Sequence, residues 1–187
     1  MSWLLALHSS SEVLGVGVRR LGDPEPGRTA AFPLGRGLSN ELFTCVEQLL
    51  PAAQWPELGR LVVATGPGGF TGTRLTVVLA RTLAQQLGIP LHGVSSFLLV
   101  AAREPLASPV WVVQELPRRG RVAGLYGPDP LALAGVRELE PPRLFAPGAD
   151  GPSGFQLSAQ AVIPRDVDTL LAIGAAAERQ QLAGPWQ

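Results

Sequence analysis

Short apolar runs and polar turns alternate along the first part of the chain. An apolar run over residues 3–8 ends in a cluster of serines, and an alternating segment follows it over residues 12–19. This pattern is typical of a β-hairpin. A third strand is expected over residues 29–34, and Pro33 favours a sheet edge because proline cannot donate a backbone hydrogen bond. The chain is therefore predicted to begin with three antiparallel strands.

Helical and extended segments alternate after these strands. Ser39 is a favourable N-cap, apolar residues follow it at helical spacing, and Pro51 ends the pattern, which predicts a helix up to Leu50. Gly88 suits a left-handed helix C-cap. The other elements are expected in this order: a strand over 60–65, a helix over 73–87, a strand over 89–94 and a helix from 95 to about 103.

The resulting order of elements, βββαβαβα, indicates an α/β fold. Three antiparallel strands followed by two αβ crossovers give a five-stranded mixed sheet with helices on its faces, the ribonuclease-H-like arrangement. The pattern changes after residue 104, beyond which 11 of the 18 prolines lie. Regular periodicity is limited there to three segments, 109–114, 121–126 and a helix near 165–182. We expect a first lobe over residues 1–104 and a shortened, loop-rich, degenerate second lobe over residues 105–187.

The charged residues exclude several kinds of chemistry. All 15 basic residues are arginine, so the chain has no lysine for a phosphate-binding P-loop, a Schiff base or a Ser–Lys dyad. The net charge is zero, and only 16% of the residues are charged. Because binding to nucleic acid through a protein's own field needs an excess of clustered positive charge, we expect any contact with RNA to be indirect.

Cysteine and histidine usage is low. One cysteine and two histidines are too few for a structural zinc site or an intramolecular disulfide. We expect no catalytic residues, no bound metal and no cofactor. The apolar N-terminal run is too short for a signal peptide, and no stretch reaches the length of a membrane helix, which predicts a cytoplasmic protein.

A glycine-rich turn between the predicted strand 60–65 and the following helix is the most specific local feature. Its glycines are Gly66, Gly68, Gly69 and Gly72. A turn of this kind permits close approach of another backbone, and the helix that follows it offers unpaired N–H groups to an anion. Two interpretations remain open: a phosphate site, or a tight turn whose glycines allow close packing.

The predicted helix over residues 73–87 is apolar on two sides, which indicates burial on two sides. One side carries large residues such as Leu75, Val78 and Leu79, and the other carries small ones. In the preceding helix, Phe43 is expected to point inward. The small side of one helix and a flank of the other form a candidate partner surface made of Thr44, Cys45, Gln48, Thr73, Thr76, Val77, Ala80 and Ala84. The alternative is that the second lobe covers this surface within the chain.

Three segments of this region resemble the TsaB (YeaZ) family. They are 66–75 (GPGGFTGTRL), 80–84 (ARTLA) and 89–97 (IPLHGVSSF), and the family pattern contains a Gly-Pro-Gly-Ser-Phe-Thr-Gly-x-Arg stretch. The resemblance spans roughly the first 104 residues and fades after them. It implies the ASKHA (actin-like ATPase) fold.

The resemblance also implies a function. A member of this family is a non-catalytic subunit that binds and stabilises its catalytic paralogue TsaD. The complex makes N6-threonylcarbamoyladenosine next to the anticodon of tRNAs that decode codons beginning with A. It further implies a heterodimer with TsaD through the first two helices, a ternary complex with the ATPase TsaE, and a homodimer when the chain is alone.

The chain departs from the family pattern at several positions. His8 stands where the superfamily has an aspartate after the first strand, and Mg²⁺ prefers oxygen ligands. Gly69 replaces the usual serine, and Leu38 replaces a frequent histidine. We interpret His8 as a hydrogen-bonded hairpin residue and not as a general base, because no acidic partner is evident in the sequence nearby.

Two other functions remain as alternatives. The shortened second lobe is compatible with a degenerate homodimeric scaffold, and the glycine-rich turn is compatible with a weak ATP-binding enzyme. Peptidase activity is not favoured, because the chain lacks a Gly-x-Ser-x-Gly elbow and a His-Glu-x-x-His helix.

Overall fold

The computed structural model describes residues 2–184, which form two compact units. The chain up to Ser95 and the chain from Val162 onward make up the first unit, and Ser96–Ala161 make up the second. The second unit is thus inserted into the sequence of the first.

A five-stranded mixed sheet is the centre of the first unit. Its spatial order is β3-β2-β1-β4-β5, in which β1 pairs antiparallel with β2 and parallel with β4. The other pairs are antiparallel β2–β3 and parallel β4–β5. The strands are β1 (Trp3–His8), β2 (Val13–Arg20), β3 (Arg28–Pro33), β4 (Leu58–Ala64) and β5 (Leu91–Val94). As Pro33 predicts, β3 is an edge strand.

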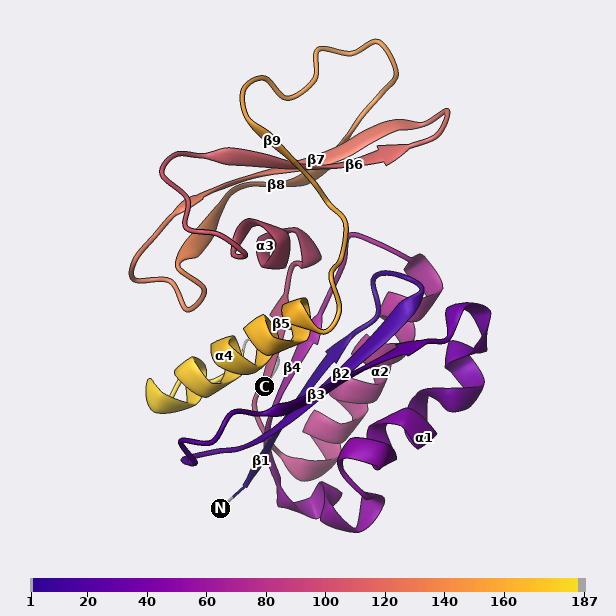
Figure 1. Ribbon diagram of the computed structural model, residues 1–187, viewed down its shortest axis with the longest axis vertical. Coiled ribbons are helices and arrows are strands. Elements are labelled where there is room, and N and C mark those ends of the chain that lie inside the picture. The colour runs from indigo at the N-terminus through magenta and orange to yellow at the C-terminus, as the bar shows by residue number, and fades with distance from the viewer. Residues whose placement is uncertain (1, 185–187) are drawn as a thin grey trace. The chain divides into compact units, whose positions relative to one another are not determined.

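Helices cover both faces of this sheet (Figure 1). On one face lie α1 (Leu38–Leu49) and α2 (Phe70–Leu87), and on the other lies α4 (Arg165–Arg179). Two short 3₁₀ segments, η1 (Gly35–Gly37) and η2 (Ala52–Glu57), flank α1. Alternate strand residues supply each face, since Leu5 and Leu7 pack with α1 and α2, whereas Leu4 lies against α4.

The face covered by α4 allows a very close approach of helix to strand. A Cβ atom added to Gly17 in β2 would lie 2.6 Å from a methyl group of Val167, and one added to Gly174 in α4 would lie 2.8 Å from Leu4. Contacts this short are not tolerated between real side chains. Glycines on both elements therefore set the spacing between α4 and the sheet.

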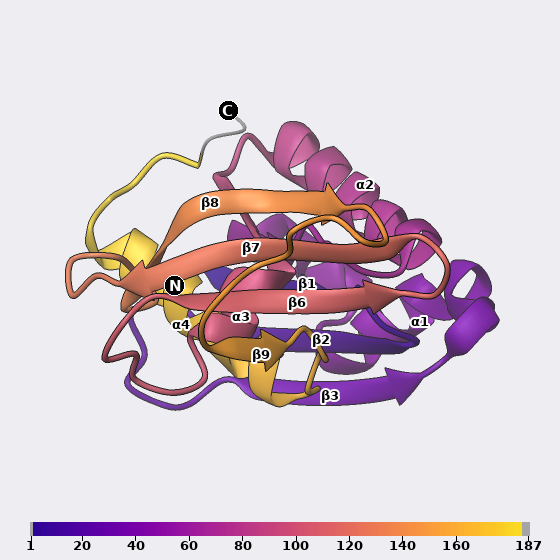
Figure 2. The same cartoon turned by 90° about the horizontal axis from the view of Figure 1, so that it is seen from above.

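The second unit is a four-stranded sheet with one helix. Figure 2 shows its strands side by side in the order β8-β7-β6-β9. The elements are α3 (Ser96–Ala101), β6 (Val110–Leu116), β7 (Gly120–Pro128), β8 (Val136–Phe145) and β9 (Gln156–Ser158). Phe97 and Val100 of α3 pack with Val112 and Tyr126 in a separate small core.

The observed elements confirm the predicted α/β fold and the order βββαβαβα. Gly88 is the left-handed C-cap of α2, with φ of +64°. The predicted helix starts were late, because α1 begins at Leu38 with Gly37 as N-cap, and α2 begins at Phe70 with Gly69 as N-cap. The hydrogen bond from the Thr73 N–H to the Gly69 carbonyl, at 3.0 Å, belongs to this additional first turn.

The second half of the chain differs most from expectation. The division between units does not follow the expected boundary after residue 104, because α3 joins the second core and α4 packs on the first sheet. The expected loop-rich lobe also contains a strand, β8, that the sequence pattern did not indicate. Pro141 and Pro142 lie within β8, where they are tolerated because β8 is an edge strand.

Candidate functional site

The glycine-rich turn packs against the turn between β1 and β2. The Gly69 N–H donates to the Ser10 carbonyl at 2.7 Å, and the Ser9 hydroxyl donates to the Gly72 carbonyl at 2.8 Å. A Cβ atom at Gly68 would collide with the Ser10 backbone. This geometry gives the glycines a packing role, which is one of the two interpretations of the sequence.

The other interpretation, an anion site, concerns a cavity at the start of α2. It has a volume of about 530 Å³. Its lining includes the polar residues Arg36, Ser39 and Thr71, together with the acidic Glu12. Gly69 and Gly72 also line it. Binding of phosphate by Gly66, Gly68, Gly69 and Gly72 stays a prediction.

His8 has the acidic neighbour that the sequence did not reveal. His8 Nε2 lies 4.0 Å from Asp166 Oδ2 of α4 and 3.4 Å from the Ser10 hydroxyl, and all three residues are buried. The interpretation of His8 as lacking an acidic partner was therefore wrong. In a Ser–His–Asp relay, however, the serine and the carboxylate contact opposite ring nitrogens. Here both approach Nε2, so the cluster does not have the geometry of that relay.

Asp166 instead has a structural connection at the start of α4. Its Oδ2 accepts a hydrogen bond from the Val162 N–H at 2.8 Å. The buried carboxylate thus joins the segment that precedes α4 to the end of β1. This arrangement supports the interpretation of His8 as a hydrogen-bonded structural residue.

The predicted partner surface is mostly on the wrong side of its helices. Five of its eight residues are buried in the first unit, namely Cys45, Thr73, Thr76, Ala80 and Ala84. Ala80 is 0% exposed and belongs to the core that α1, α2 and the sheet share. The small residues of α2 face the sheet, because they allow the helix to lie close to β4. A partner cannot contact them in the folded chain.

Thr76 is an example of a buried, hydrogen-bonded residue on this side of α2. Its hydroxyl lies 2.7 Å from the Ser9 hydroxyl and donates to the Thr73 carbonyl at 3.2 Å.

Cys45 of α1 is buried in the same core. Burial, together with the negative charge of Glu41, raises the pKa of the Cys45 thiol. Cys45 is thus an unreactive core residue at neutral pH.

Exposed residues of α1 and α2 form a surface that we call the outer face. Of the predicted partner residues, Thr44 and Gln48 lie on it, and Val77 is partly buried beside it. Phe43, expected to point inward, is 53% exposed, and Val78 is 61% exposed. The outer face consists of Phe43, Thr44, Glu47, Gln48, Phe70, Arg74, Val78, Arg81, Thr82 and Gln85. Sequence periodicity identified both sides of α2 but not which one the sheet covers.

A buried arginine in the sheet forms hydrogen bonds with the C-terminal segment of the first unit. Arg60 of β4 is 3% exposed; its Nε donates to Glu178 Oε2, and its Nη1 donates to His92 Nε2 and to the Leu182 carbonyl, each at 2.9 Å. Since arginine can only donate, His92 Nε2 must accept and carries no proton. Burial and, secondarily, the charge of Arg60 lower the pKa of His92. This cluster was not predicted from the sequence.

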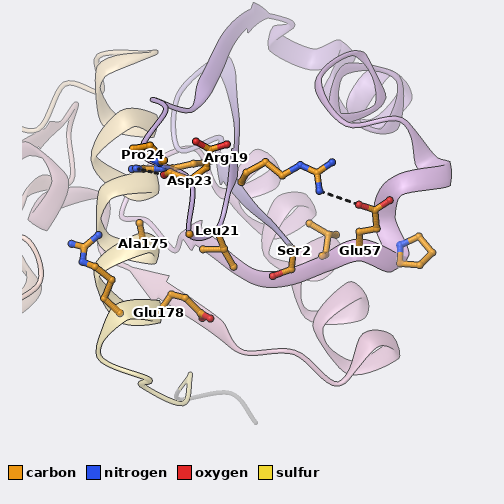
Figure 3. Close-up of a pocket in the computed structure, with 13 residues that line it drawn as sticks. Ser2, Arg19, Leu21, Asp23, Pro24, Glu57, Ala175 and Glu178 are labelled. Atoms are coloured by element: carbon orange, nitrogen blue, oxygen red, sulfur yellow. Dashed lines mark hydrogen bonds and ion pairs between the residues drawn. The ribbon is translucent and has the colours of Figure 1, made fainter.

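A second cavity lies at the opposite end of the first sheet from the glycine-rich turn, and Figure 3 shows the residues that line it. It has a volume of about 860 Å³, and its lining carries equal numbers of acidic and basic side chains: Arg19, Arg20, Arg179, Asp23, Glu57 and Glu178. The Arg20 guanidinium is paired with Glu57 at 3.2 Å. The balanced charge and this internal pairing favour no particular ligand.

The described part of the chain offers few other sites. In the β6–β7 hairpin, Arg121 Nε lies 3.9 Å from Glu115 Oε1. Within residues 2–184, no cluster of three or more His, Cys, Asp or Glu side chains is arranged to hold a metal ion. None of the helices in that range combines the length and the hydropathy that a membrane-spanning helix needs.

Comparisons with known proteins find matches in the part of the chain that carries the sequence resemblance. Residues 34–113 match the family model described as TsaD, tRNA N6-adenosine threonylcarbamoyltransferase. A stretch of 75 residues is 45% identical to the tRNA threonylcarbamoyladenosine biosynthesis protein TsaB of Bacillus subtilis (strain 168). That stretch covers 37% of this chain and 31% of the Bacillus protein. An uncharacterized protein of Mycobacterium leprae (strain TN) is 45% identical over 47 residues, which cover 25% of this chain and 13% of that protein.

A solved structure extends the likeness over nearly the whole chain. YeaZ from Pseudomonas aeruginosa superposes with a TM-score of 0.73 over 96% of this chain and 93% of that one, at 21% identity. Together these comparisons support the resemblance to the TsaB/YeaZ family. A second solved structure, of an uncharacterized protein with similarity to peptidase YEAZ from Pseudomonas aeruginosa, has a TM-score of 0.65 and 22% identity over 82% of this chain and 71% of that one.

The comparisons support the resemblance, and the structural likeness fits the expected ASKHA-like fold. The chain matches less than a third of the length of either curated relative. The matched family model ends at residue 113, so it includes α1 and α2 but little of the second unit.

Proposed function

We propose that this TsaB/YeaZ chain is a non-catalytic subunit that binds and stabilises TsaD in the synthesis of N6-threonylcarbamoyladenosine in tRNA. The modified adenosine lies next to the anticodon of tRNAs that decode codons beginning with A. The observation that carries the proposal is the outer face of α1 and α2, where Phe43, Phe70 and Val78 are 53%, 71% and 61% exposed.

Exposed apolar side chains on adjacent helices are typical of a surface that a partner covers. Here they occur on two helices whose inner sides are already filled by the core of the first unit. The family-model match over residues 34–113 includes both helices. We therefore place the TsaD contact on the outer face and not on the buried side that contains Ala80 and Ala84.

The polar cluster at the end of β1 supports a subunit without chemistry of its own. His8 stands where the superfamily has an aspartate, and its neighbours Ser10 and Asp166 approach the same ring nitrogen. We propose that the complex also includes TsaE, that tRNA is contacted only indirectly, and that the chain forms a homodimer when TsaD is absent. All of these interactions are expected to take place in the cytoplasm.

The test is binding to purified TsaD from the same organism. We expect a stable mixed complex on size exclusion with mass determination, and a higher melting temperature of TsaD in the mixture. Val78→Asp places a charge in the centre of the outer face and should weaken binding by about 10- to 100-fold, because desolvating a carboxylate in an apolar contact is costly.

Leu144→Asp is the matched control, since Leu144 is 60% exposed but lies on β8 of the second unit. It should bind TsaD as the unmodified chain does. A persistent homodimer that never exchanges with TsaD would contradict the proposal and favour a homodimeric scaffold. Nucleotide binding that weakens when Gly68 is replaced by valine would favour the ATP-binding alternative.

A further inference from the structure

The two helices of the outer face carry opposite charge. The charged residues of α1 are Glu41 and Glu47, both acidic and both exposed. Those of α2 are Arg74 and Arg81, both basic and both exposed. Neither helix contains a residue of the other sign. On the outer face, α1 therefore contributes the acidic Glu47, with Glu41 earlier on the same helix, and α2 contributes the basic Arg74 and Arg81, although the chain as a whole is neutral.

The charges lie beside the apolar contacts. Arg74, Val78 and Arg81 follow one another at spacings of four and three residues, which places them on one side of α2. Phe43 and Glu47 are four residues apart on α1. Each exposed apolar side chain thus has a neighbouring charge whose sign is characteristic of its helix.

Local contacts hold part of this pattern in place. The Arg74 guanidinium lies over the Phe70 ring at 4.3 Å, and the Phe43 ring stacks on Trp55 with a centroid distance of 6.2 Å. A guanidinium that rests on an aromatic ring keeps its charge at the surface and its hydrogen-bond donors available. The basic surface on α2 is therefore partly arranged before a partner arrives.

We propose that this division of charge selects the orientation of the partner. The proposal rests on the proposed function: TsaD would place an acidic helical surface against α2 and a basic one against α1. The apolar contacts at Phe43 and Val78 would allow the partner to bind in either of two orientations related by a half turn. Charge decides between them, because the reversed orientation brings like charges together, which weakens binding and slows association.

The experiment measures association rate constants with purified TsaD for charge-reversed variants of the full chain. Arg74→Glu and Glu47→Arg should each lower the rate constant by about tenfold. Matched controls carry the same charge changes elsewhere: Arg179→Glu at the end of α4, on the other face of the sheet, and Glu25→Arg before β3. These controls should change the rate constant less than about twofold. For the unmodified chain, the rate constant should fall when NaCl is raised from about 50 to about 500 mM.

Val78→Asp separates this inference from the proposed function. If Val78→Asp binds TsaD normally, the outer face is not the contact surface, and the charge-selected orientation fails while binding to TsaD itself stands. If it binds weakly while Arg74→Glu and Glu47→Arg behave like their controls and salt has no effect, the contact surface stands and the charge-selected orientation is wrong. If the charge variants slow association and the controls do not, the inference is supported.

Discussion

The two faces of the five-stranded sheet are held by different interactions. Against α1 and α2 the sheet presents an apolar core that includes Leu5, Leu7 and Leu61. On the α4 side, the same strands bury His8, Arg60 and His92 beside apolar contacts such as that of Leu4, and Asp166 of α4 is buried with them. Apolar packing is tolerant of direction, whereas a buried polar group is costly unless its partner is correctly placed. The polar groups on the α4 side, which we call the polar face, therefore help to specify where α4 packs. On the other side, the outer surfaces of α1 and α2 stay exposed and available to a partner.

The sharpest test of this contrast compares two neighbouring positions on α2. Ala80→Arg places a guanidinium against the sheet and should lower the free energy of unfolding by about 4 kcal/mol or more. Val78→Arg, on the outer face, should change it by less than about 0.5 kcal/mol. Urea unfolding followed by circular dichroism measures both. Equal effects would show that the assigned inner and outer sides of α2 are wrong.

On the polar face, Arg60→Met should have an intermediate effect. The change removes the donor to His92 and to the Leu182 carbonyl, and it removes the ion pair with Glu178, whose side chain is 44% exposed. We expect a loss of about 2–3 kcal/mol in the free energy of unfolding. Arg20→Met, which breaks the more exposed pair with Glu57, is the control and should cost about 0.5 kcal/mol. Similar losses in the two variants would contradict the assigned role of Arg60.

The smallest expected effect is a dependence on pH. The pKa of His92 is lowered in the folded chain from its ordinary value of 6.5. The unfolded chain therefore binds a proton first as the pH falls, so stability that is present above pH 6.5 is lost progressively between 6.5 and the lower folded pKa. His92→Gln keeps an acceptor for Arg60 but does not titrate. Its stability should decline less between about pH 7 and pH 5 in urea titrations. If the free energy of unfolding of His92→Gln falls as steeply with pH as that of the unmodified chain, His92 is not the source of the pH dependence.

Much of the first unit could be predicted from the sequence because its signals are local. Serine-rich and glycine-containing turns separate the strands, and Gly88 marks the end of α2. The second unit was less predictable, since the consecutive prolines at 141 and 142 are not typical of a strand and β8 was therefore not expected. The sequence predicted the helix but not its packing on the first sheet, because the contacts of α4 with β1 and β2 join residues far apart in the chain.

The candidate surface shows the same limit. A helix that is apolar on two sides does not reveal which side the sheet covers, and so Cys45, Thr76, Ala80 and Ala84 were placed outside when they are inside. The choice depends on how closely the helix must approach β4, which is a property of the packed structure. The contacts of His8 with Asp166, and of Arg60 with Glu178, likewise depend on the position of α4.

The return of α4 to the first sheet has a consequence for biosynthesis. A ribosome makes β1 to β5 first, then the whole second unit, and only then the helix that covers the open face of the first sheet. Until α4 emerges, His8, Arg60 and His92 face solvent, and the glycines of β2 have no helix above them. The first unit thus completes its core only after the second unit has been made, while the uninterrupted second unit is free to fold earlier.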